Sequence, residues 1–597
     1  MRTSNRALFA VALTAMAVGV AAQDRPESIL PPGFGDPAPA PRPAARPTPG
    51  ASGTPTRPIA TATAAVLPRD PAGAVVQPLP GDTPTPVPIP TASPTPVDPK
   101  ALAAYEMPDF ARRSTALVGV SGEMAPDAFG DADGRYLEML MRRTAAPLPS
   151  RWLSIALRRT LAARLQTPRG VDGADYAAER AWLLLRMGES VAARSVVEGV
   201  DNADYTPKLY QVAMNAMLAT GDPAGLCPLA DAGLATTHEA GWALAQPICA
   251  SLAGNATAAR AQFAAVRRRR PGADIDLRLA QKVMGAGGQG RQAVTIEWDG
   301  VDRLTVWRLG LAMATGATIP DTLYDGVGAQ ATYWRALSPS IALGDRIAPA
   351  EAAAAQGVLS TAALVDLYGA VAANEDSTSA ASATADDLRT AYAATDPAAR
   401  LTALRQLWGN DAPYARLVLT ARAAARQPVA AGNTDVDRLV AAMLSAGLDR
   451  TAARWAGAVP AGGDAWAMLA LADPDARRRF GLSDVQGYDA SGHAEEKRRL
   501  FFAGLAGLGR MGADEIERTA KDLDVRIGTT NSWTRAIDRA AADGQPGTVL
   551  LLAAIGMQTP GWRGVPPAGL YRIVAALRSV GLDGEARMIA AEAIARA

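Results

Sequence analysis

The sequence predicts an all-α protein, an α-solenoid of stacked helical hairpins that follows a signal peptide and a disordered linker. Glycines that end helical segments recur at Gly188, Gly221 and Gly254, and the step is 33 residues both times. A period near 33 is the length of a helical hairpin that stacks on its neighbours. Aromatic residues make up only 5% of the chain and alanine is abundant. This composition suits close-packed helices better than a sheet.

The residues after each glycine fit a turn between two helices. A glycine ends a helix readily because the position after the last helical residue adopts a positive φ, which is unfavourable for residues with a Cβ. Ser190, Asp222 and Asn255 are the predicted N-caps, whose side chains accept hydrogen bonds from backbone N–H groups. Pro223 fits the first helical position, where no N–H is needed. A third step of the period lands on Gly287.

Similar hairpins recur toward the C-terminus. They turn at Gly447 and Gly581, and Asp449 and Asp583 are the predicted caps. The stretch 176–270, with small residues and turns at regular positions, resembles the tetratricopeptide family, although it does not meet the full pattern of Trp, Tyr and Pro positions. We therefore describe the predicted repeat as TPR-like.

The resemblance implies a concave groove that binds peptides or protein helices. By analogy, the groove residues lie on the first helix of each hairpin, and the candidates are Tyr210, Asn215 and Trp242. If one of these residues is structural instead, its replacement by alanine is expected to unfold the protein rather than weaken binding.

Residues 1–22 have the features of a Sec-type signal peptide. Arg2 and Arg6 precede an apolar run that ends in small residues, and cleavage is predicted after Ala22. The alternative is an uncleaved membrane anchor, but the run is short for a span of ~20 residues. No cysteine follows the run directly, which argues against a lipoprotein anchor. Export would place the protein in the periplasm or outside the cell.

Residues 23–100 are rich in proline, alanine and threonine. They predict a disordered linker, because such a stretch cannot bury a core and favours the extended polyproline II conformation. The simplest interpretation is a spacer. A second interpretation concerns the segment ESILPPGFGD, where Ile29, Leu30 and Phe34 are large apolar residues in a polar tether. These three residues are a candidate docking peptide for a partner.

The chain contains two cysteines, Cys227 and Cys249. The pattern places Cys227 near the start of one helix of a hairpin and Cys249 near the end of the next, so their side chains lie side by side. We predict a disulfide between them, because export leads to an oxidising compartment. The alternative is two buried free thiols. Pro228 and Pro247 flank the cysteines and are expected to kink both helices.

Composition divides the remaining chain. Residues 101–373 form a first helical-repeat region, the polar stretch 374–387 is a predicted loop, and residues 388–597 form a second helical-repeat region. The formal net charge of +1 gives no global attraction to nucleic acid or to an anionic membrane. The densest basic run, Arg267–Arg270, ends a predicted helix, so we interpret it as cations at the negative helix end. A patch that binds an anion or nucleic acid is the alternative.

Motifs that carry catalytic chemistry are weak. Gly285–Gly290 match a dinucleotide-binding pattern in spacing, but a helical segment rather than a strand precedes them. His238 and His493 lack a second histidine at metal-binding spacing. Glu189 and Ser190 resemble the Glu-Ser pair of some soluble lytic transglycosylases, yet they lie in a repeat turn without that family's apolar context. We therefore predict no catalytic residue, no cofactor and no metal.

The sequence thus predicts a non-catalytic, exported helical-repeat scaffold that binds protein or peptide partners in the bacterial cell envelope. It predicts no nucleic-acid partner and, once the signal peptide is removed, no integral membrane protein. The alternatives are a peptidoglycan-associated factor, a superhelical accessory of a lytic enzyme, and a spacer without a specific ligand. Glycan binding usually needs exposed aromatic residues, whereas core packing is the stronger expectation for the tryptophans of this chain.

Overall fold

The computed structural model describes residues 108–269, 274–287, 293–374, 379–475 and 477–597. The chain divides into two compact units, one comprising 1–35 with 114–597 and the other comprising 36–113. Of the second unit, the structure describes the end, with the 3-10 helix η1 (Asp109–Ala111). Every other element belongs to the first unit.

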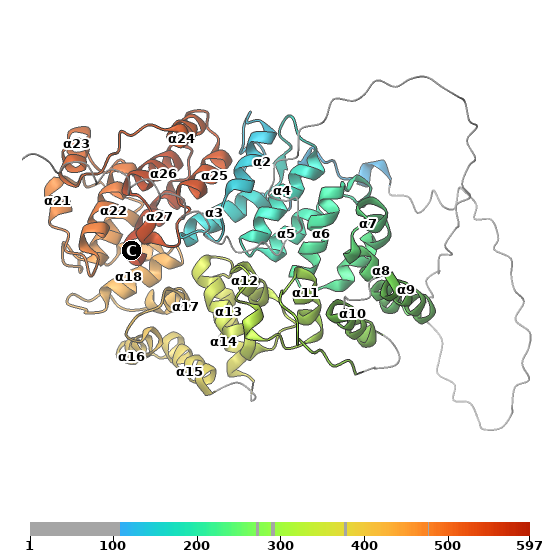
Figure 1. Cartoon of the computed structure of the whole chain (residues 1–597). Helices are drawn as coiled ribbons and strands as arrows, with labels where there is room; N and C mark the ends of the chain where they lie inside the picture. The colour runs from blue at the N-terminus through green and yellow to red at the C-terminus, as the bar shows by residue number, and fades with distance from the viewer. Residues whose placement is uncertain (1–107, 270–273, 288–292, 375–378, 476) are drawn as a thin grey trace, which may run out of the picture. The chain divides into compact units, whose positions relative to one another are not determined.

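The described part of the first unit is mostly helical, which confirms the predicted all-α class (Figure 1). Two short strands, β1 (Leu117–Val118) and β2 (Leu165–Gln166), pair in antiparallel orientation, with Leu117 opposite Gln166. The first helices are α2 (Gly134–Arg143), α3 (Arg151–Ala162), α4 (Gly173–Arg186), α5 (Ser190–Glu198), α6 (Pro207–Ala219), α7 (Ala230–Thr237), α8 (Ala240–Leu252), α9 (Ala256–Arg269) and α10 (Asp274–Gly287).

The next helices lie between residues 293 and 374, and the last ones follow residue 378. The former are α11 (Val306–Thr315), α12 (Gln330–Leu337), α13 (Leu343–Gln356) and α14 (Thr361–Ala372). The latter are α15 (Ser379–Ala393), α16 (Pro397–Trp408), α17 (Tyr414–Ala424), α18 (Val436–Ser445), α19 (Asp449–Ala453), α20 (Asp464–Ala472), α21 (Leu482–Gln486), α22 (Ala494–Gly507), α23 (Ala513–Asp522), α24 (Ser532–Ala542), α25 (Pro546–Gly556), α26 (Pro567–Ser579) and α27 (Asp583–Arg596). The 3-10 helices of this unit include η2 (Asn202–Asp204), η3 (Pro223–Leu229), η4 (Asp321–Leu323) and η5 (Trp562–Gly564).

The predicted glycine turns are present in the structure. Gly188, Gly221 and Gly254 adopt φ values of 89°, 69° and 79°, the left-handed conformation that glycine tolerates. The side chain of Asp222 accepts hydrogen bonds from the backbone N–H groups at the start of η3. The side chain of Asn255 likewise accepts one from the third residue of α9, at 3.1 Å. These two predicted caps are confirmed.

The prediction that Ser190, Asp449 and Asp583 are N-caps is wrong. Each is the first residue of its helix, and the residue before it is the N-cap, which makes no side-chain capping bond. In all of these turns the cap is the residue directly after the glycine, so a polar residue one position later falls inside the helix. Asp449 and Asp583 instead pair with Arg587, at 2.8 and 2.9 Å.

The predicted polar loop 374–387 is helical over most of its length. Helix α15 begins at Ser379 and continues to Ala393. Its serine and threonine residues alternate with alanine, which favours the helix, and the Thr384 hydroxyl donates to the carbonyl of Ala380 at 3.0 Å. Residues 375–378 lie outside the described residues. Residues 288–292, which follow Gly287 at the end of α10, also lie outside them.

Helices that are neighbours in sequence pack together, for example α4 with α5 and α6, α8 with α9, and α17 with α18. Helices far apart in sequence also pack together. The middle helices return onto the early ones, with α11 on α6, α12 on α5 and α13 on α3, while α25 and α27 pack on α3 (Figure 1). In a simple solenoid each repeat contacts only its neighbours. The returning contacts therefore add a feature that the repeat pattern did not predict, and the TPR-like repeat itself stays a prediction.

Buried and partly buried arginines join helices by donating hydrogen bonds to the carbonyl ends of neighbouring helices. Arg151 is 4% exposed and donates to backbone carbonyls of Leu359 at 3.4 Å and Ser445 at 3.2 Å, after α13 and at the end of α18. Arg186 donates to the last turn of α2 at 2.6 Å. Arg510 reaches the end of α20 in the same way, at 2.6 Å. A planar guanidinium suits this role because it has several N–H donors and carries the charge that the negative helix end favours.

Candidate functional site

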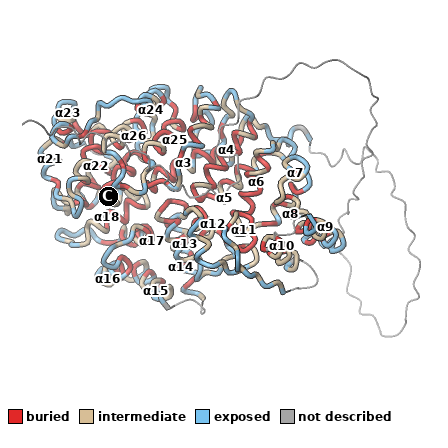
Figure 2. Tube along the Cα trace, viewed as in Figure 1, coloured by how far each residue is buried: buried red, intermediate tan, exposed pale blue. Residues whose placement is uncertain are grey.

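The residues predicted to line a groove are buried in the core, so that prediction is corrected. Tyr210, Asn215 and Trp242 are 4%, 6% and 0% exposed, and the buried interior of their helices is visible in Figure 2. The rings of Tyr210 and Trp242 pack edge to face with centroids 6.0 Å apart. The Asn215 amide donates to the Gln211 carbonyl of its own helix at 2.8 Å. Every residue of α6 from Leu209 to Ala219 except Gln211 is buried, so the helix leaves no open face for a groove.

The predicted docking peptide, Ile29, Leu30 and Phe34, lies outside the described residues, as do the signal peptide with its cleavage after Ala22 and the linker 23–100. These stay predictions.

The predicted disulfide is confirmed. Cys227 and Cys249 are joined across a sequence separation of 22 residues, with Cα atoms 5.3 Å apart. Cys227 lies in the 3-10 helix η3 rather than in an α-helix, and Pro228 follows it inside η3. Pro247 lies inside α8, as the sequence indicated. The bond ties η3 to α8.

The Glu-Ser pair is enclosed by protein. Glu189 is 4% exposed and Ser190 is fully buried, and the Ser190 hydroxyl has no hydrogen-bond partner among the described residues. A guanidinium nitrogen of Arg158 lies 3.3 Å from the Glu189 carboxylate. Burial raises the pKa of Glu189 to about 7, and Arg158 opposes the shift. The pair is thus a buried junction between α3 and the α4–α5 turn, and its side chains do not reach an open surface.

A surface recess near the C-terminus is a candidate binding site. It consists of two adjoining pockets, about 410 and 340 Å³ in volume, which share Ile527 and Gly528. We call it the C-terminal recess. The larger pocket is lined by Ile527, Gly528, Asp538, Ala541, Tyr571, Arg572, Ala575, Ala576 and Ser579, and the smaller by Glu517, Ala520, Lys521, Asp524, Val525, Arg526, Ile527 and Gly528.

Local sequence shapes the recess at the connection between α23 and α24. Asp524 adopts φ 52°, a left-handed turn after α23, and Val525 anchors the segment in the core with 7% exposure. Asn531 then starts α24 with a reciprocal cap, because its side chain accepts from the Thr534 N–H at 2.9 Å and its own N–H donates to the Thr534 hydroxyl at 2.8 Å. Ile527 and Gly528 are held between these two fixed points.

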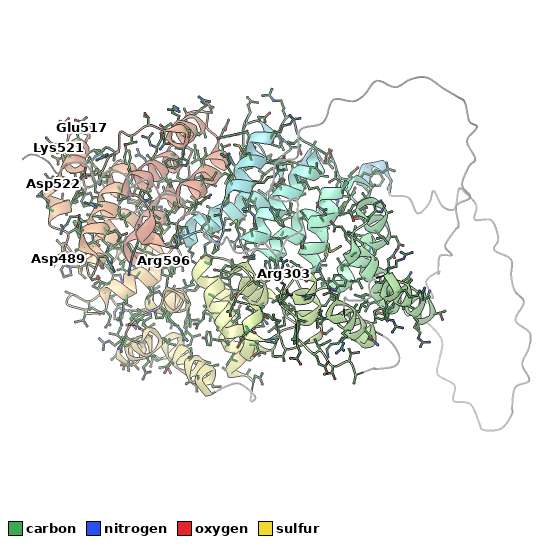
Figure 3. All side chains as sticks on the ribbon, viewed as in Figure 1. Arg303, Asp489, Glu517, Lys521, Asp522 and Arg596 are labelled. Carbon is green, nitrogen blue, oxygen red and sulfur yellow. A yellow bond between two sulfur atoms is a disulfide. The ribbon has the colours of Figure 1, made fainter. Side chains whose placement is uncertain are left out.

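The recess combines an apolar floor with a charged rim. Ala541 and Ala575 contribute small apolar surfaces, and Tyr571 is half-buried. Arg572 of α26 forms an ion pair with Asp538 of α24, and it donates a hydrogen bond to the Ile527 carbonyl at 3.2 Å. On the other side α23 presents charged side chains, among them Glu517 and Lys521, which Figure 3 labels. Small apolar floors with polar rims are typical of sites that bind peptides or protein side chains.

A further pocket, separate from the C-terminal recess, lies at the start of α22. It measures about 480 Å³ and includes His493, Glu495, Arg499 and Arg563. His493 adopts φ 43°, a left-handed conformation that is uncommon for a residue with a side chain. Arg499 already pairs with Glu495 at 2.7 Å. Within the described residues, no group of three or more His, Cys, Asp or Glu is arranged to hold a metal ion.

Sequence reasoning missed the C-terminal recess. The signal that points to it is the non-helical stretch between α23 and α24, which ends in Gly528 and the Asn531 cap. The packing of α26 beside α24, which completes the recess, depends on contacts between segments about 30 residues apart and is invisible in local patterns.

Comparisons of the chain with protein-family models, with curated proteins and with solved structures found no match. Across the part of the chain that the structure describes, no helix is both long and apolar enough to span a bilayer. The functional argument therefore depends on the geometry of the site.

Proposed function

We propose that the protein is a non-catalytic helical scaffold of the bacterial cell envelope that binds a protein or peptide partner at the C-terminal recess. The observation that carries the proposal is the apolar floor of the recess between α24 and α26, beside the charged helix α23. Such a surface fits a segment with one or two small apolar side chains flanked by charges of both signs. The predicted signal peptide and the disulfide between Cys227 and Cys249 support an oxidising location.

The proposal is tested by crosslinking in cells. A photo-crosslinking amino acid is placed at Ala575, which lies in the recess, and at Ala542, which is exposed on α24 outside it. We expect one protein adduct from Ala575, identified by mass spectrometry of envelope fractions, and no such adduct from Ala542. An unspecific ladder from both positions, or no adduct from Ala575, contradicts the recess as the binding site.

A matched pair of variants measures how much the floor of the recess contributes to the affinity for the partner. Ala575→Arg fills the floor of the larger pocket and is expected to lower affinity for the crosslinked partner at least ~10-fold, because the bulky charge displaces an apolar contact. Ala542→Arg adds the same charge outside the recess and is expected to bind normally. Equal thermal unfolding of both variants separates lost binding from lost folding.

A peptidoglycan-associated role is the second proposal, because Tyr571 supplies an aromatic ring in the larger pocket that a sugar ring can stack on. Saturable sedimentation with purified peptidoglycan, lost in Tyr571→Ala and retained in Tyr571→Phe, would favour this function over a protein partner. An absence of sedimentation excludes it.

A further inference from the structure

Helix α9 carries exposed arginines that the C-terminal recess does not use. Its sequence, ATAARAQFAAVRRR, contains no acidic residue, and Ala259 and Val266 are its buried positions. Figure 2 shows exposed and intermediate residues along most of this helix. We use the name arginine face for its exposed cations, which are Arg260, Arg267, Arg268 and Arg269.

The arginine face is a local excess of positive charge. The whole chain has a formal net charge of +1, so most cations are balanced by carboxylates. Arg194, for example, pairs with Glu198 at 2.7 Å and with Asp222 at 2.8 Å. Within the described residues, none of the four guanidinium groups of the arginine face pairs with a carboxylate. Their charge is available to an external anion.

Helix electrostatics explain only part of this cluster. Cations in the last turn stabilise the negative end of a helix, which accounts for Arg267, Arg268 and Arg269. Arg260 lies outside the last turn, and the effect of the helix dipole falls off within one turn. Arg260 and Arg267 are seven residues apart and therefore lie on the same side of α9.

The arrangement of the arginines indicates the form of the partner. Consecutive residues are ~100° apart around a helix axis, so the three terminal guanidinium groups fan over roughly 200°. One small rigid anion cannot contact all of them, whereas many mobile headgroups can. Apart from these side chains, the exposed positions of α9 are mostly small, which lets the helix approach a flat surface.

We propose that the arginine face of α9 binds the surface of a membrane that contains anionic phospholipids. The attraction is between guanidinium groups and lipid phosphates, and each arginine near such a surface contributes about 5-fold to the binding constant. This inference is independent of the C-terminal recess. It adds a membrane-surface contact at helix α9 to the envelope scaffold, and α9 lies on the surface without entering the bilayer.

The test is flotation of the purified full chain, without its signal segment, with lipid vesicles. Vesicles of phosphatidylcholine with phosphatidylglycerol are compared with vesicles of phosphatidylcholine alone, at low and high salt. We expect binding to the anionic vesicles only, and weaker binding at high salt because counterions screen the charges. In the variant with all four arginines of the face replaced by serine, the partition coefficient is expected to fall at least ~20-fold.

A control variant removes the same amount of charge from elsewhere. Its replaced residues are exposed arginines of α2 and α24, namely Arg135, Arg143, Arg535 and Arg539. The control is expected to bind anionic vesicles nearly as well as the unmodified protein. An equal loss in both variants would show that net charge alone acts, and equal binding to neutral vesicles would overturn the proposal. Stronger binding to nucleic acid or to a polyglutamate peptide than to the vesicles would also overturn the lipid assignment.

Discussion

The hydroxyl of Ser150 donates a hydrogen bond to the carboxylate of Glu592 at 2.6 Å, across a sequence separation of 442 residues. The same carboxylate accepts from the backbone N–H groups of Arg151 at 2.8 Å and Trp152 at 3.2 Å, and it pairs with Arg596 at 2.7 Å. Glu592 is 3% exposed. The last helix of the larger unit, α27, therefore supplies an anion at the N-terminus of α3, and this contact joins an early helix to a late one.

Removal of this carboxylate is expected to destabilise the protein strongly. Glu592→Ala leaves backbone N–H groups and the Arg596 guanidinium without their buried partner, so the free energy of unfolding should fall by about 3 kcal/mol. Glu585→Ala, on the same helix but without these contacts, should change it by less than about 0.5 kcal/mol. Urea denaturation of both variants measures the difference. Similar unfolding midpoints would contradict a structural role for the Ser150–Glu592 contact.

The disulfide is expected to contribute about 3 kcal/mol to stability. It closes a loop with a sequence separation of 22 residues between Cys227 and Cys249, and so restricts the unfolded chain. Cys227→Ser with Cys249→Ser should lower the denaturation midpoint and make the protein insensitive to reductant. The unmodified protein should shift to nearly the same midpoint when it is reduced. If reductant leaves its midpoint unchanged, the bond does not stabilise the fold.

Two turn glycines of the same conformation are expected to differ in their tolerance of alanine. Gly188 and Gly254 have φ values of 89° and 79°. A Cβ at Gly188 would lie 2.5 Å from the Tyr333 ring, whereas a Cβ at Gly254 would meet no atom within 4 Å. Gly254→Ala should cost only the backbone strain of about 1–2 kcal/mol. Gly188→Ala should cost about 3 kcal/mol, because steric overlap adds to that strain.

Thermal unfolding of the two glycine variants, in parallel with the unmodified protein, measures this difference. The comparison controls for backbone conformation, so the excess loss at Gly188 reports the contact between the α4–α5 turn and α12. Equal losses would show that this turn moves freely away from Tyr333.

The buried carboxyl of Glu189 is expected to make stability depend on pH. Its pKa in the folded protein is raised to about 7 from 4.5, because burial disfavours the charged form. The folded state therefore binds the proton more tightly than the unfolded state, and this contribution to stability is lost as pH rises from 4.5 to 7. Arg158 and Arg151 oppose the loss. The decrease is on the order of 1–3 kcal/mol.

Glu189→Gln removes this titration. The variant should show a flatter dependence of unfolding free energy on pH between about 4.5 and 7, measured by urea denaturation across that range. Glu585→Gln, at a partly exposed position of α27, should keep the slope of the unmodified protein. If Glu189→Gln also keeps that slope, then Glu189 does not titrate in this interval.

Local chemistry was sufficient to predict several features of this chain. The left-handed glycines, the caps at Asp222 and Asn255, and the pairing of Cys227 with Cys249 all depend on residues close in sequence. The positive φ of a tight turn favours glycine wherever it occurs. A side-chain cap is favoured at a helix start but not required. Asp222 and Asn255 provide one, whereas the N-caps before Ser190, Asp449 and Asp583 do not. Such features are therefore visible in the sequence, and the 33-residue period with the abundance of alanine predicts the all-α class.

Tertiary packing decided where each apolar face lies. Tyr210 and Trp242 were predicted to line a groove but are buried, because their rings pack against each other between α6 and α8, and Trp242 also lies against Gly233 of α7. The C-terminal recess and the contact of Ser150 with Glu592 likewise bring together segments that are separated in sequence, and no local sequence pattern indicates that these segments are in contact. An apolar face requires burial but does not specify its partner, since the hydrophobic effect is proportional to area and has no direction. The arrangement of all the helices in the fold therefore determines which apolar faces pack together.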